Sequence, residues 1–455
     1  MNPSEKPSIL LINPHWTGMA RQKQRQFRRV WPPLCLATAA GMLLREGFPV
    51  RVLDNNAEGL PLDEIRKRAE GAGLVFLTST PYDRWQCPSI SIDFFLETAR
   101  VIPPEKLFIL GGHVTERPET LLRETGARAA ILGEPEETIV EICRKDALSE
   151  GFDRLREIAG TAFLENGKFH RPPVRPYMAD LDGLATPAFH LLPMERYHYF
   201  PVMGKPFTIL ESSRGCPGRC TFCYLGMYGR KVRVKSAARF LDEIEFCAKM
   251  HRVKNFYFMD LEFCLNRERT EEICRGILER GLKINWCCQT RVNDIDDELA
   301  ALMKKAGCSL IHFGVEAGNP EILAATRKGI TVQKALSAVA LCRKNGIRTA
   351  VFMNFGFPGE TLAQMEETID LAIAMNPTYA SFHLIVPFPG TELAEKLGVG
   401  PEDFPPGLYP SYNHTSHELA PLKKMLHRAY RRFYLRPSYA LTWLSDHKKA
   451  LRSAP

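Results

Sequence analysis

The stretch FTILESSRGCPGRCTFCYLG, residues 207–226, joins a short apolar run to a loop that carries three cysteines. Cys216, Cys220 and Cys223 have the spacing C-x3-C-x2-C, with glycine and proline between them. Thiolates crowded this tightly repel one another unless a metal centre takes up their charge. The loop therefore predicts a metal or iron–sulfur site directly after a strand.

Two kinds of metal centre suit three cysteines in one loop. Zinc takes four ligands, and Cys247 or His251 further along the chain could supply the fourth. A second C-x2-C pair would support zinc, and the sequence has none. An iron–sulfur cube held by three cysteines leaves one iron open to a small molecule, and we favour this interpretation.

Strand-like and helical patterns alternate from residue 206 to about residue 395. The expected strands lie at residues 207–213, 255–260, 284–290, 310–316, 349–358 and 379–387. The expected helices between them lie at residues 236–250, 267–281, 296–307, 331–346 and 362–375. Six β/α steps predict a parallel barrel that is short of closure, with its chemistry at the carboxyl ends of the strands. The cysteine loop follows the first strand, at that end.

Residues 1–150 show a separate series of the same alternation. Apolar runs lie at residues 8–14, 49–55, 74–80, 106–112 and 129–133, with amphipathic segments between them. This pattern predicts an open parallel α/β sheet, in which a ligand binds beyond the carboxyl ends of the strands where the strand order reverses. No G-x-G-x-x-G follows the first strand, so a dinucleotide is poorly supported.

Two further segments complete the division of the chain. Residues 151–205 are expected to form a proline-bearing linker with a small hairpin, because Asn166-Gly167 is a strong turn signal. Residues 396–455 are expected to be helical and basic, and the formal net charge of +8 is concentrated there. Apolar residues recur in this region at helical spacing, which favours a helix docked on the protein over one that binds an anionic membrane surface or nucleic acid. We expect no nucleic-acid partner.

Composition indicates a soluble globular protein, with 45% hydrophobic and 25% charged residues. No apolar run approaches the roughly 20 residues that span a bilayer, and no basic-then-apolar leader is present. Arg28-Arg29 precedes a segment that is better explained as the first helix of a domain than as an export signal. The 13 cysteines are too scattered for a disulfide framework and suit a reducing compartment. We therefore expect a cytoplasmic location.

The cysteine loop, with the aromatic Phe222 before its last cysteine, resembles that of the radical S-adenosylmethionine (radical SAM) superfamily. FYFMDLEFCLN, with Asp260 and Glu262, is similar to the family's second strand, and LIHFGVEAGNPEIL, with Glu316, to its fourth. MNFGFPGET, with Gly356, and IVPFPGTEL resemble its fifth and sixth. The resemblance implies a 4Fe-4S cluster on the three cysteines and S-adenosylmethionine on its open iron. A 5′-deoxyadenosyl radical would then abstract hydrogen from an unactivated carbon.

Three more polar residues are candidates for contacts with S-adenosylmethionine. Gln289 and Arg291 follow the third strand, where arginine suits the methionine carboxylate, although a salt bridge that closes the strand end is the alternative. Glu316 lies between apolar neighbours at a strand end and must find a cation or hydrogen-bond donors. The resemblance offers the ammonium or ribose of S-adenosylmethionine for this role.

The cysteines outside the loop are expected to be structural. Cys287 and Cys288 are adjacent, so their side chains should point to opposite faces of a strand rather than chelate together. Four other cysteines of the expected barrel lie in or near helical segments and are interpreted as core residues: Cys264, Cys274, Cys308 and Cys342.

The first 150 residues and the linker resemble a radical SAM subfamily that also carries a cobalamin-binding domain. The similar pieces are WPPLCLATAAGMLLREGFPVRVLD, LVFLTSTPYDRW, FILGGHVTERPETLL, AAILGEPEETIVEI and LDGLATPAFHLLPMERY. The resemblance implies a Rossmann-like cobalamin-binding domain before a partial (β/α)6 radical SAM barrel and a helical tail. The motif Asp-x-His-x-x-Gly, whose histidine ligates cobalt, is absent. A scaffold that has lost its ligand is the alternative.

Residues at the expected strand ends would hold the nucleotide tail of cobalamin, since serine and threonine supply polar contacts and glycine allows close backbone approach. These residues are Thr78, Ser79, Gly111, Gly112 and Gly133. Either Arg84 or Trp85 would lie under the corrin ring without ligating cobalt. His113 is interpreted as a turn contact and is not assigned to cobalt.

The resemblance implies a class B methyltransferase-like enzyme that transfers a methyl group from methylcobalamin to an unactivated carbon. An oxidative, ring-forming enzyme acting on a tetrapyrrole-like substrate is one alternative, and a non-catalytic cobalamin or redox sensor is another. A methylthiotransferase is disfavoured because the first domain has only the isolated Cys35, Cys87 and Cys143. We expect an apolar small-molecule substrate and an electron donor such as ferredoxin or flavodoxin. The sequence indicates neither the substrate nor the oligomeric state.

Overall fold

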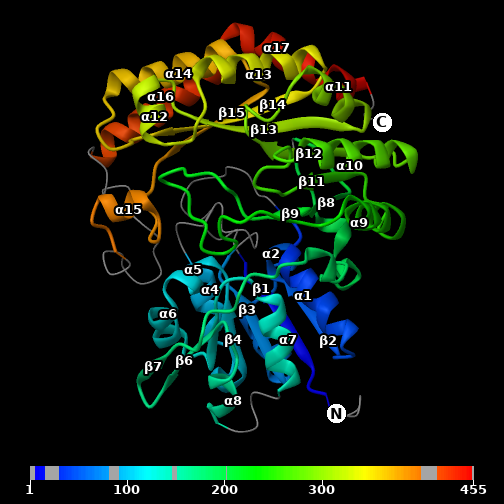
Figure 1. Ribbon diagram of the computed structural model, residues 1–455. Helices are drawn as coiled ribbons and strands as arrows, with labels where there is room; N and C mark the ends of the chain where they lie inside the picture. The colour runs from blue at the N-terminus through cyan, green and yellow to red at the C-terminus, as the bar shows by residue number, and fades with distance from the viewer. Residues whose placement is uncertain are drawn as a thin grey trace.

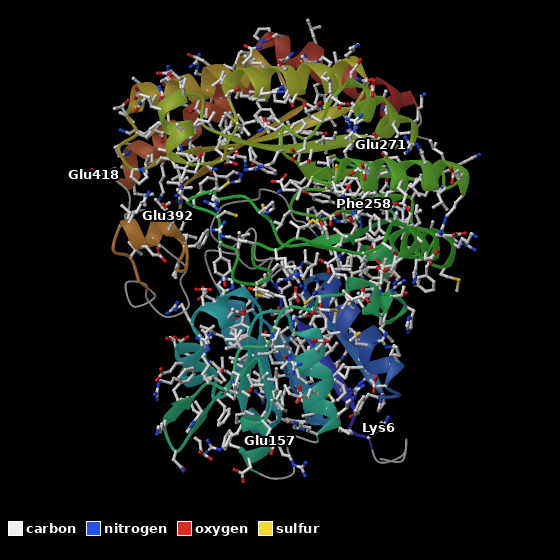
Figure 2. All side chains as sticks on the ribbon, in the orientation of Figure 1. Lys6, Glu157, Phe258, Glu271, Glu392 and Glu418 are labelled. Atoms are coloured by element: carbon white, nitrogen blue, oxygen red, sulfur yellow. The ribbon has the colours of Figure 1, made fainter. Side chains whose placement is uncertain are left out.

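We describe a computed structural model of the protein over residues 6–15, 30–80, 92–145, 151–200, 202–400 and 418–452. It contains two large β-sheets, and Figure 1 shows the first, blue to cyan, below the second, green to orange. The buried Phe258 lies in the second sheet, whereas the labelled charged residues Lys6, Glu157 and Glu392 lie at the margins of the molecule (Figure 2). None of the helices in these residues has the length and apolar character needed to cross a bilayer.

The first sheet has seven strands in the order β2-β1-β3-β4-β5-β6-β7. Its strands are β1 (Ile9–Asn13), β2 (Val50–Asp54), β3 (Leu74–Thr78), β4 (Leu107–Leu110), β5 (Ala129–Ile131), β6 (Thr161–Glu165) and β7 (Lys168–His170). Its helices are α1 (Leu34–Arg45), α2 (Asn55–Glu58), α3 (Leu62–Glu70), α4 (Asp93–Ala99), α5 (Gly112–Glu116), α6 (Pro118–Thr125), α7 (Glu136–Arg144) and α8 (Asp153–Arg156). Strands β1–β5 are parallel, and the order reverses between β1 and β3, as predicted for an open α/β sheet.

Both faces of the first sheet are covered, which explains why its strands are continuous apolar runs rather than alternating ones. Ile9, Leu11 and Phe76 belong to the core on one face, whereas Leu10 and Ile12 belong to the core on the other. Because helices lie against both faces, only the strand ends and the edges can hold polar groups.

The hairpin that we expected in residues 151–205 is present, and it pairs with the first sheet. Its turn is Asn166-Gly167, and both residues have positive φ, 50° and 78°, as a two-residue hairpin turn requires. Strand β6 pairs antiparallel with β5 through Ala130 and Ala162. The sequence pattern identified the hairpin but carried no information about its partner strand.

The second sheet is parallel throughout, in the chain order β8-β11-β12-β13-β14-β15. Its strands are β8 (Phe207–Leu210), β11 (Asn255–Phe258), β12 (Asn285–Thr290), β13 (Cys308–Glu316), β14 (Arg348–Phe355) and β15 (Tyr379–Leu384). The helices are α9 (Ala237–Met250), α10 (Arg267–Glu279), α11 (Asp297–Lys305), α12 (Pro320–Ala325), α13 (Val332–Lys344), α14 (Leu362–Met375), α15 (Glu392–Lys396), α16 (Leu419–Tyr434) and α17 (Pro437–Arg452). The predicted six-step partial barrel is confirmed.

A small two-stranded ribbon, β9 (Ser213–Arg214) with β10 (Arg233–Val234), brackets the cysteine loop. Figure 1 places β9 between the two sheets. The loop is therefore located where residues of the first sheet can reach it.

The segment before the barrel attaches the first sheet to the second. Trp31 is buried in the core of the second sheet, with its ring 5.7 Å from that of Phe207. Tyr197 donates a hydrogen bond to Asp54 at the end of β2, at 2.8 Å, and the Ala188 N–H donates to the carbonyl of Ala37 in α1, at 2.8 Å. Residues 181–200 are thus packed against both units.

Helix α16 covers the free edge of β15. The Tyr434 hydroxyl bonds to both the N–H and the carbonyl of Ala380, at 3.0 and 2.8 Å. The Tyr430 hydroxyl, one helical turn earlier, bonds to both backbone groups of Phe382, at 3.3 and 3.2 Å. Since alternate residues of an edge strand direct their backbone groups outward, these two hydroxyls replace a neighbouring strand.

The Tyr430→Phe/Tyr434→Phe variant should lose about 1–2 kcal/mol of stability per hydroxyl, because each loss leaves a backbone N–H and C=O without their partner. Hydrogen exchange of the Ala380 and Phe382 amides should accelerate selectively. Tyr439→Phe is the matched control, because its hydroxyl donates to the carbonyl of Thr378, the residue before β15. Equal exchange rates in wild type and the double variant would contradict the assignment.

Candidate active site

The start of the cysteine loop is fixed by a buried carboxylate. Asp260 follows β11 and accepts hydrogen bonds from the backbone N–H and the hydroxyl of both Ser212 and Ser213. Gly215 then turns the chain with φ of +87°, and a Cβ there would lie 2.3 Å from the Lys231 carbonyl oxygen. Only glycine fits this position.

The three thiols of the loop interact with one another. Burial, together with the neighbouring Cys220 and Cys216, raises the pKa of Cys223 to about 12, and burial, with Glu262 and Cys220, raises the pKa of Cys216. The Gly218 N–H points at Cys216 Sγ, at 3.4 Å, and Arg291 Nη2 lies 3.8 Å from Cys220 Sγ. Three neighbouring cysteines with an N–H group and an arginine beside them fit an iron–sulfur cluster. The positive charge of the cluster would displace the thiol protons and hold the three thiolates together.

The residues offered for a zinc alternative are used elsewhere. Cys247 is completely buried on α9, in the same core as Phe240 and Ile244. His251 packs edge-on against Phe189, with ring centroids 6.3 Å apart. In the described ranges, no three His, Cys, Asp or Glu side chains are arranged to hold a single ion.

A charged cluster lies beside the thiols at the carboxyl ends of β11–β14. Lys328 Nζ is 2.7 Å from Glu316 Oε1, and Arg291 Nε is 3.6 Å from Glu262 Oε1. Arg291 also donates to the Lys328 carbonyl at 2.5 Å, and Asn354 donates to Glu316. The structure therefore brings together Glu262, Arg291 and Glu316, three of the candidate residues for S-adenosylmethionine.

Glu262 keeps one buried oxygen available for a ligand. Its Oε2 has no hydrogen-bond partner within the described part of the chain, and burial raises the pKa of this carboxyl to about 7. A buried carboxylate oxygen needs a donor or a cation. The ammonium group of S-adenosylmethionine satisfies that need, so the site fits this cofactor.

Glu316 has a strained backbone. Its φ is +74°, and the pairing of β13 with β14 shifts register between Gly314 and Glu316. A glutamate in the left-handed region costs on the order of 1–3 kcal/mol and is found mainly at functional sites. The shift directs the Glu316 carboxylate toward Lys328 and Asn354 rather than along the strand.

Lys328 was not identified from the sequence. It follows α12 in the turn TRKG, which has the composition of a solvent-exposed turn, yet its side chain is only 11% exposed. The adjacent carboxylates raise its pKa, Glu316 foremost, against the effect of burial. The only sequence signal for its burial was the need of Glu316 for a cation.

Several predicted residues have structural partners in the same region. Asp260 positions the cysteine loop, as described above, so its bonds favour a positioning role over direct cofactor contact. Gln289 donates to the Leu261 carbonyl at 3.4 Å, and the Gly356 N–H donates to Glu360 at 2.7 Å. Phe222 contacts Phe357, with ring centroids 5.8 Å apart, and so joins the cysteine loop to the turn after β14.

The strand ends of the first sheet bring together the residues proposed for cobalamin. The Ser79 N–H donates to the Leu110 carbonyl at 2.8 Å, and its buried Oγ lacks a hydrogen-bond partner among the residues described. A Cβ on Gly111 would lie 2.6 Å from Thr80 Oγ1, and Gly112 donates to that same oxygen at 2.7 Å. Thr78 is buried at the end of β3.

Gly133 adds open space to this cradle. Its φ is +71°, a Cβ there would meet no atom within 4 Å, and its N–H donates to Thr115 at 3.1 Å. An unpartnered hydroxyl and unfilled space beside glycines fit a polar ligand tail. Arg84 and Trp85 lie outside the described residues, so their assignment stays a prediction, and so does the interpretation of His113.

The two sheets meet at the root of the cysteine loop through buried ion pairs. Arg214 is fully buried, two residues before Cys216, and its guanidinium reaches Glu136 at 2.5 Å, Glu211 at 2.6 Å and Glu134 at 3.5 Å. Glu134 follows Gly133 and also pairs with Arg233 at 2.7 Å.

A second contact lies nearby, because Thr115 Oγ1 is 3.4 Å from Met227 Sδ. Strand-end residues of the first sheet therefore contact the cysteine loop directly. The sequence did not identify this network.

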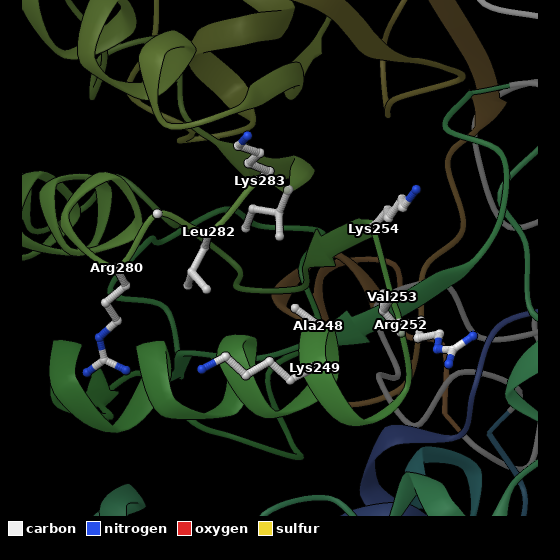
Figure 3. A pocket seen from close by; sticks show the side chains of 10 residues that line it. Ala248, Lys249, Arg252, Val253, Lys254, Arg280, Leu282 and Lys283 are labelled. Carbon is white, nitrogen blue, oxygen red and sulfur yellow. The ribbon is translucent and has the colours of Figure 1, made fainter.

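A hollow of 460 Å³ lies at the opposite ends of the barrel strands (Figure 3). It is bordered by residues 248–249, 252–254 and 280–284, at the amino ends of β11 and β12. It is not part of the active site, because the cysteine loop lies at the carboxyl ends.

Together, the fold and the thiol loop define an enzyme with an open α/β domain before a partial barrel that carries a cluster. The sequence model of the radical SAM superfamily matches residues 210–372 of this chain. An uncharacterized methyltransferase of Pyrococcus horikoshii is 33% identical over 444 residues, which cover 92% of this chain and 93% of the relative. The chain belongs to the radical SAM superfamily.

Other relatives and structures extend the comparison. An anaerobic magnesium-protoporphyrin IX monomethyl ester cyclase of Rubrivivax gelatinosus is 30% identical over 90% of this chain and 75% of the relative. The radical SAM methyltransferase TsrM of Kitasatospora setae, solved with cobalamin and a [4Fe-4S] cluster, has a TM-score of 0.71 and 20% identity over 95% of this chain and 89% of that one. The cobalamin-dependent radical enzyme OxsB has a TM-score of 0.72 and 16% identity over 98% of this chain and 76% of that one. These structures share the fold.

Proposed function

We propose that this enzyme is a cobalamin-dependent radical SAM methyltransferase that acts on an unactivated carbon of a small molecule. The observation that carries the proposal is the direct contact of the first sheet's strand-end residues with the cysteine loop, through Arg214–Glu136 and Thr115–Met227. A ligand held at those strand ends would lie next to the thiols. The methyltransferase relative and the fold shared with TsrM support the same assignment.

The chain's own residues would bind and orient the cofactors. Cys216, Cys220 and Cys223 would hold the cluster. Glu262 would accept a hydrogen bond from the ammonium of S-adenosylmethionine, and Arg291 and Lys328 would neutralise its carboxylate. When bound, the cluster and S-adenosylmethionine supply hydrogen abstraction at carbon, and cobalamin supplies the methyl group.

Glu316 and the Ser79 region would complete the two binding sites. Glu316 already accepts from Lys328 and Asn354, and the remaining lone pairs of its carboxylate would accept from a ribose hydroxyl. Ser79 Oγ and the space beside Gly133 would hold the tail of cobalamin. Because the reaction removes a hydrogen atom, the site needs no general base, and the main task of the protein is to position the reactants.

The first test measures cobalt and iron in full-length protein purified without oxygen from cells supplied with cobalamin. We expect about one cobalamin per chain in wild type and in the Cys216→Ala/Cys220→Ala/Cys223→Ala variant, with iron present only in wild type. Gly133→Phe should lose cobalt and keep iron, because the ring would fill the open space. Wild type that binds iron but no cobalamin would refute the methyltransferase proposal.

A ring-forming oxidation is the second candidate, favoured by the 30% identical cyclase of Rubrivivax gelatinosus. The products distinguish the two reactions. Methyl transfer yields 5′-deoxyadenosine and S-adenosylhomocysteine in equal amounts, whereas ring formation yields 5′-deoxyadenosine alone. A sensor would yield neither with any candidate substrate. In each enzymatic case we propose an apolar substrate, a ferredoxin or flavodoxin as electron donor, and a cytoplasmic location, where the cluster stays reduced.

A further inference from the structure

The net positive charge of the protein is concentrated in its last segment. Residues 419–455 contain nine Lys and Arg residues and one Asp, a net charge of +8, which equals the formal net charge of the whole chain. The preceding 418 residues are therefore neutral overall. Two of these cations, Arg428 and Arg432 of α16, form ion pairs with Glu366 and Asp370 of α14.

Helix α16 has a buried apolar side and an exposed basic side. Leu422, Met425, Ala429 and Phe433 are buried against the second sheet. Lys423, Lys424 and Arg431 are exposed on the opposite side, and no carboxylate of the described residues forms an ion pair with them. Because these cations have no role in the fold, they are available to an anionic partner.

Helix α17 adds an apolar face that the described residues do not cover. Pro437, Ala440, Leu441 and Leu444 recur at helical spacing on one side and are all exposed, whereas Tyr439 on the other side is buried. Leu435, just before the helix, is 74% exposed and Leu441 is 71% exposed. These two are the most exposed large apolar side chains in the described part of the chain.

The position of this face suits contact with an extended surface. Figure 1 shows α17, in red, on the outer side of the second sheet, away from the first sheet. The face therefore lies apart from the active site. Buried on one side and exposed on the other, α17 is anchored by the hydrogen bond from Tyr439 to the Thr378 carbonyl, at 2.9 Å.

We propose that α16 and α17 dock this protein on an anionic lipid surface. Exposed leucines beside unpaired lysine and arginine are the composition of helices that lie in the plane of a bilayer, with the apolar side among acyl chains and the cations at the headgroups. Nucleic acid has no apolar complement for Leu435, Leu441 and Leu444. This inference is independent of the proposed chemistry.

Sedimentation of the full-length protein with vesicles tests the proposal. We expect binding to phosphatidylcholine vesicles that contain phosphatidylglycerol, and much weaker binding to phosphatidylcholine alone or at high salt. Lys423→Gln/Lys424→Gln/Arg431→Gln should weaken binding about a hundredfold, since each cation near the surface contributes about a factor of five. Leu441→Ser/Leu444→Ser should weaken it about tenfold.

Matched controls come from exposed residues elsewhere. Arg252→Gln/Lys254→Gln/Lys283→Gln removes three cations at the hollow of Figure 3. Val174→Ser/Met250→Ser removes two apolar side chains that are 68% and 67% exposed. Both should bind vesicles like wild type.

Three outcomes would overturn the proposal. These are absence of vesicle binding by wild type, an equal loss in the control variants, and unchanged binding of Leu441→Ser/Leu444→Ser. Displacement of the vesicles by duplex DNA or by an acidic protein at matched charge would assign the surface to that partner instead. Circular dichroism of every variant should match wild type, because the substituted side chains are exposed.

Discussion

Cys223→Ala is expected to lose its iron and to reduce cleavage of S-adenosylmethionine to background, whereas Cys247→Ala keeps both. Cys223 is one of three neighbouring cysteines in the loop, the other two raise its pKa, and a three-thiolate cluster has no spare ligand. Cys247 is the matched control, since it is buried in the barrel core away from the loop. Its loss should cost only about 1 kcal/mol of stability.

The measurement is iron and sulfide content together with 5′-deoxyadenosine release in protein kept free of oxygen. Circular dichroism should show that both variants are folded, because the Cys223 thiol contacts the adjacent Tyr224 carbonyl, at 3.9 Å, and belongs to none of the hydrophobic cores of the described residues. If Cys247→Ala lost the metal as well, or if wild type contained stoichiometric zinc instead of iron, the cluster assignment would be wrong.

Arg214→Met is expected to lower the free energy of unfolding by about 3–5 kcal/mol, because it leaves buried carboxylates without their cation. Arg214 is 0% exposed and contacts Glu211, Glu134 and Glu136. Adding Glu136→Gln to the variant should recover part of the loss, since one uncompensated charge is removed.

The thermal midpoint of the full-length protein, at a fixed scan rate, checks this prediction. Limited proteolysis should also show earlier cleavage near the cysteine loop, because Arg214 links that loop to the first sheet. Arg267→Met is the control: the arginine is 41% exposed and pairs with Glu271, Asp296 and Glu298 at the surface, so its loss should cost less than about 1 kcal/mol. Equal losses in the two variants would show that the buried network has no special role.

The sequence predicted features that depend on local pattern and failed on contacts between distant segments. The cysteine loop and the six parallel strands of the barrel were predicted because spacing and periodicity are local properties. The Asn166-Gly167 hairpin was identified, but its pairing with β5 depends on a register that the hairpin itself does not encode. The sequence alone therefore placed it in a linker.

The residues of the candidate active site divide in the same way, into those that local patterns identify and those that depend on contacts between distant segments. Glu262, Arg291 and Glu316 lie together because each follows a neighbouring parallel strand, and strand ends meet at one edge. Arg214 and Glu134 are 80 positions apart and meet only because the two units pack together. Lys328 was missed because burial of a turn lysine depends on its tertiary partner. Asp260 was predicted as a cofactor contact, yet its oxygens bind the serines that begin the loop.

The hydroxyl-capped border of β15 has a consequence for the behaviour of the protein at high concentration. A barrel that stops at six strands would ordinarily present a row of backbone donors and acceptors, a template for pairing with another chain and for fibril growth. Tyr430 and Tyr434 occupy those groups at Ala380 and Phe382. Two side chains thus take the outward backbone groups of this edge out of reach of another chain, and the barrel can stay open at β15 without offering that strand as a template.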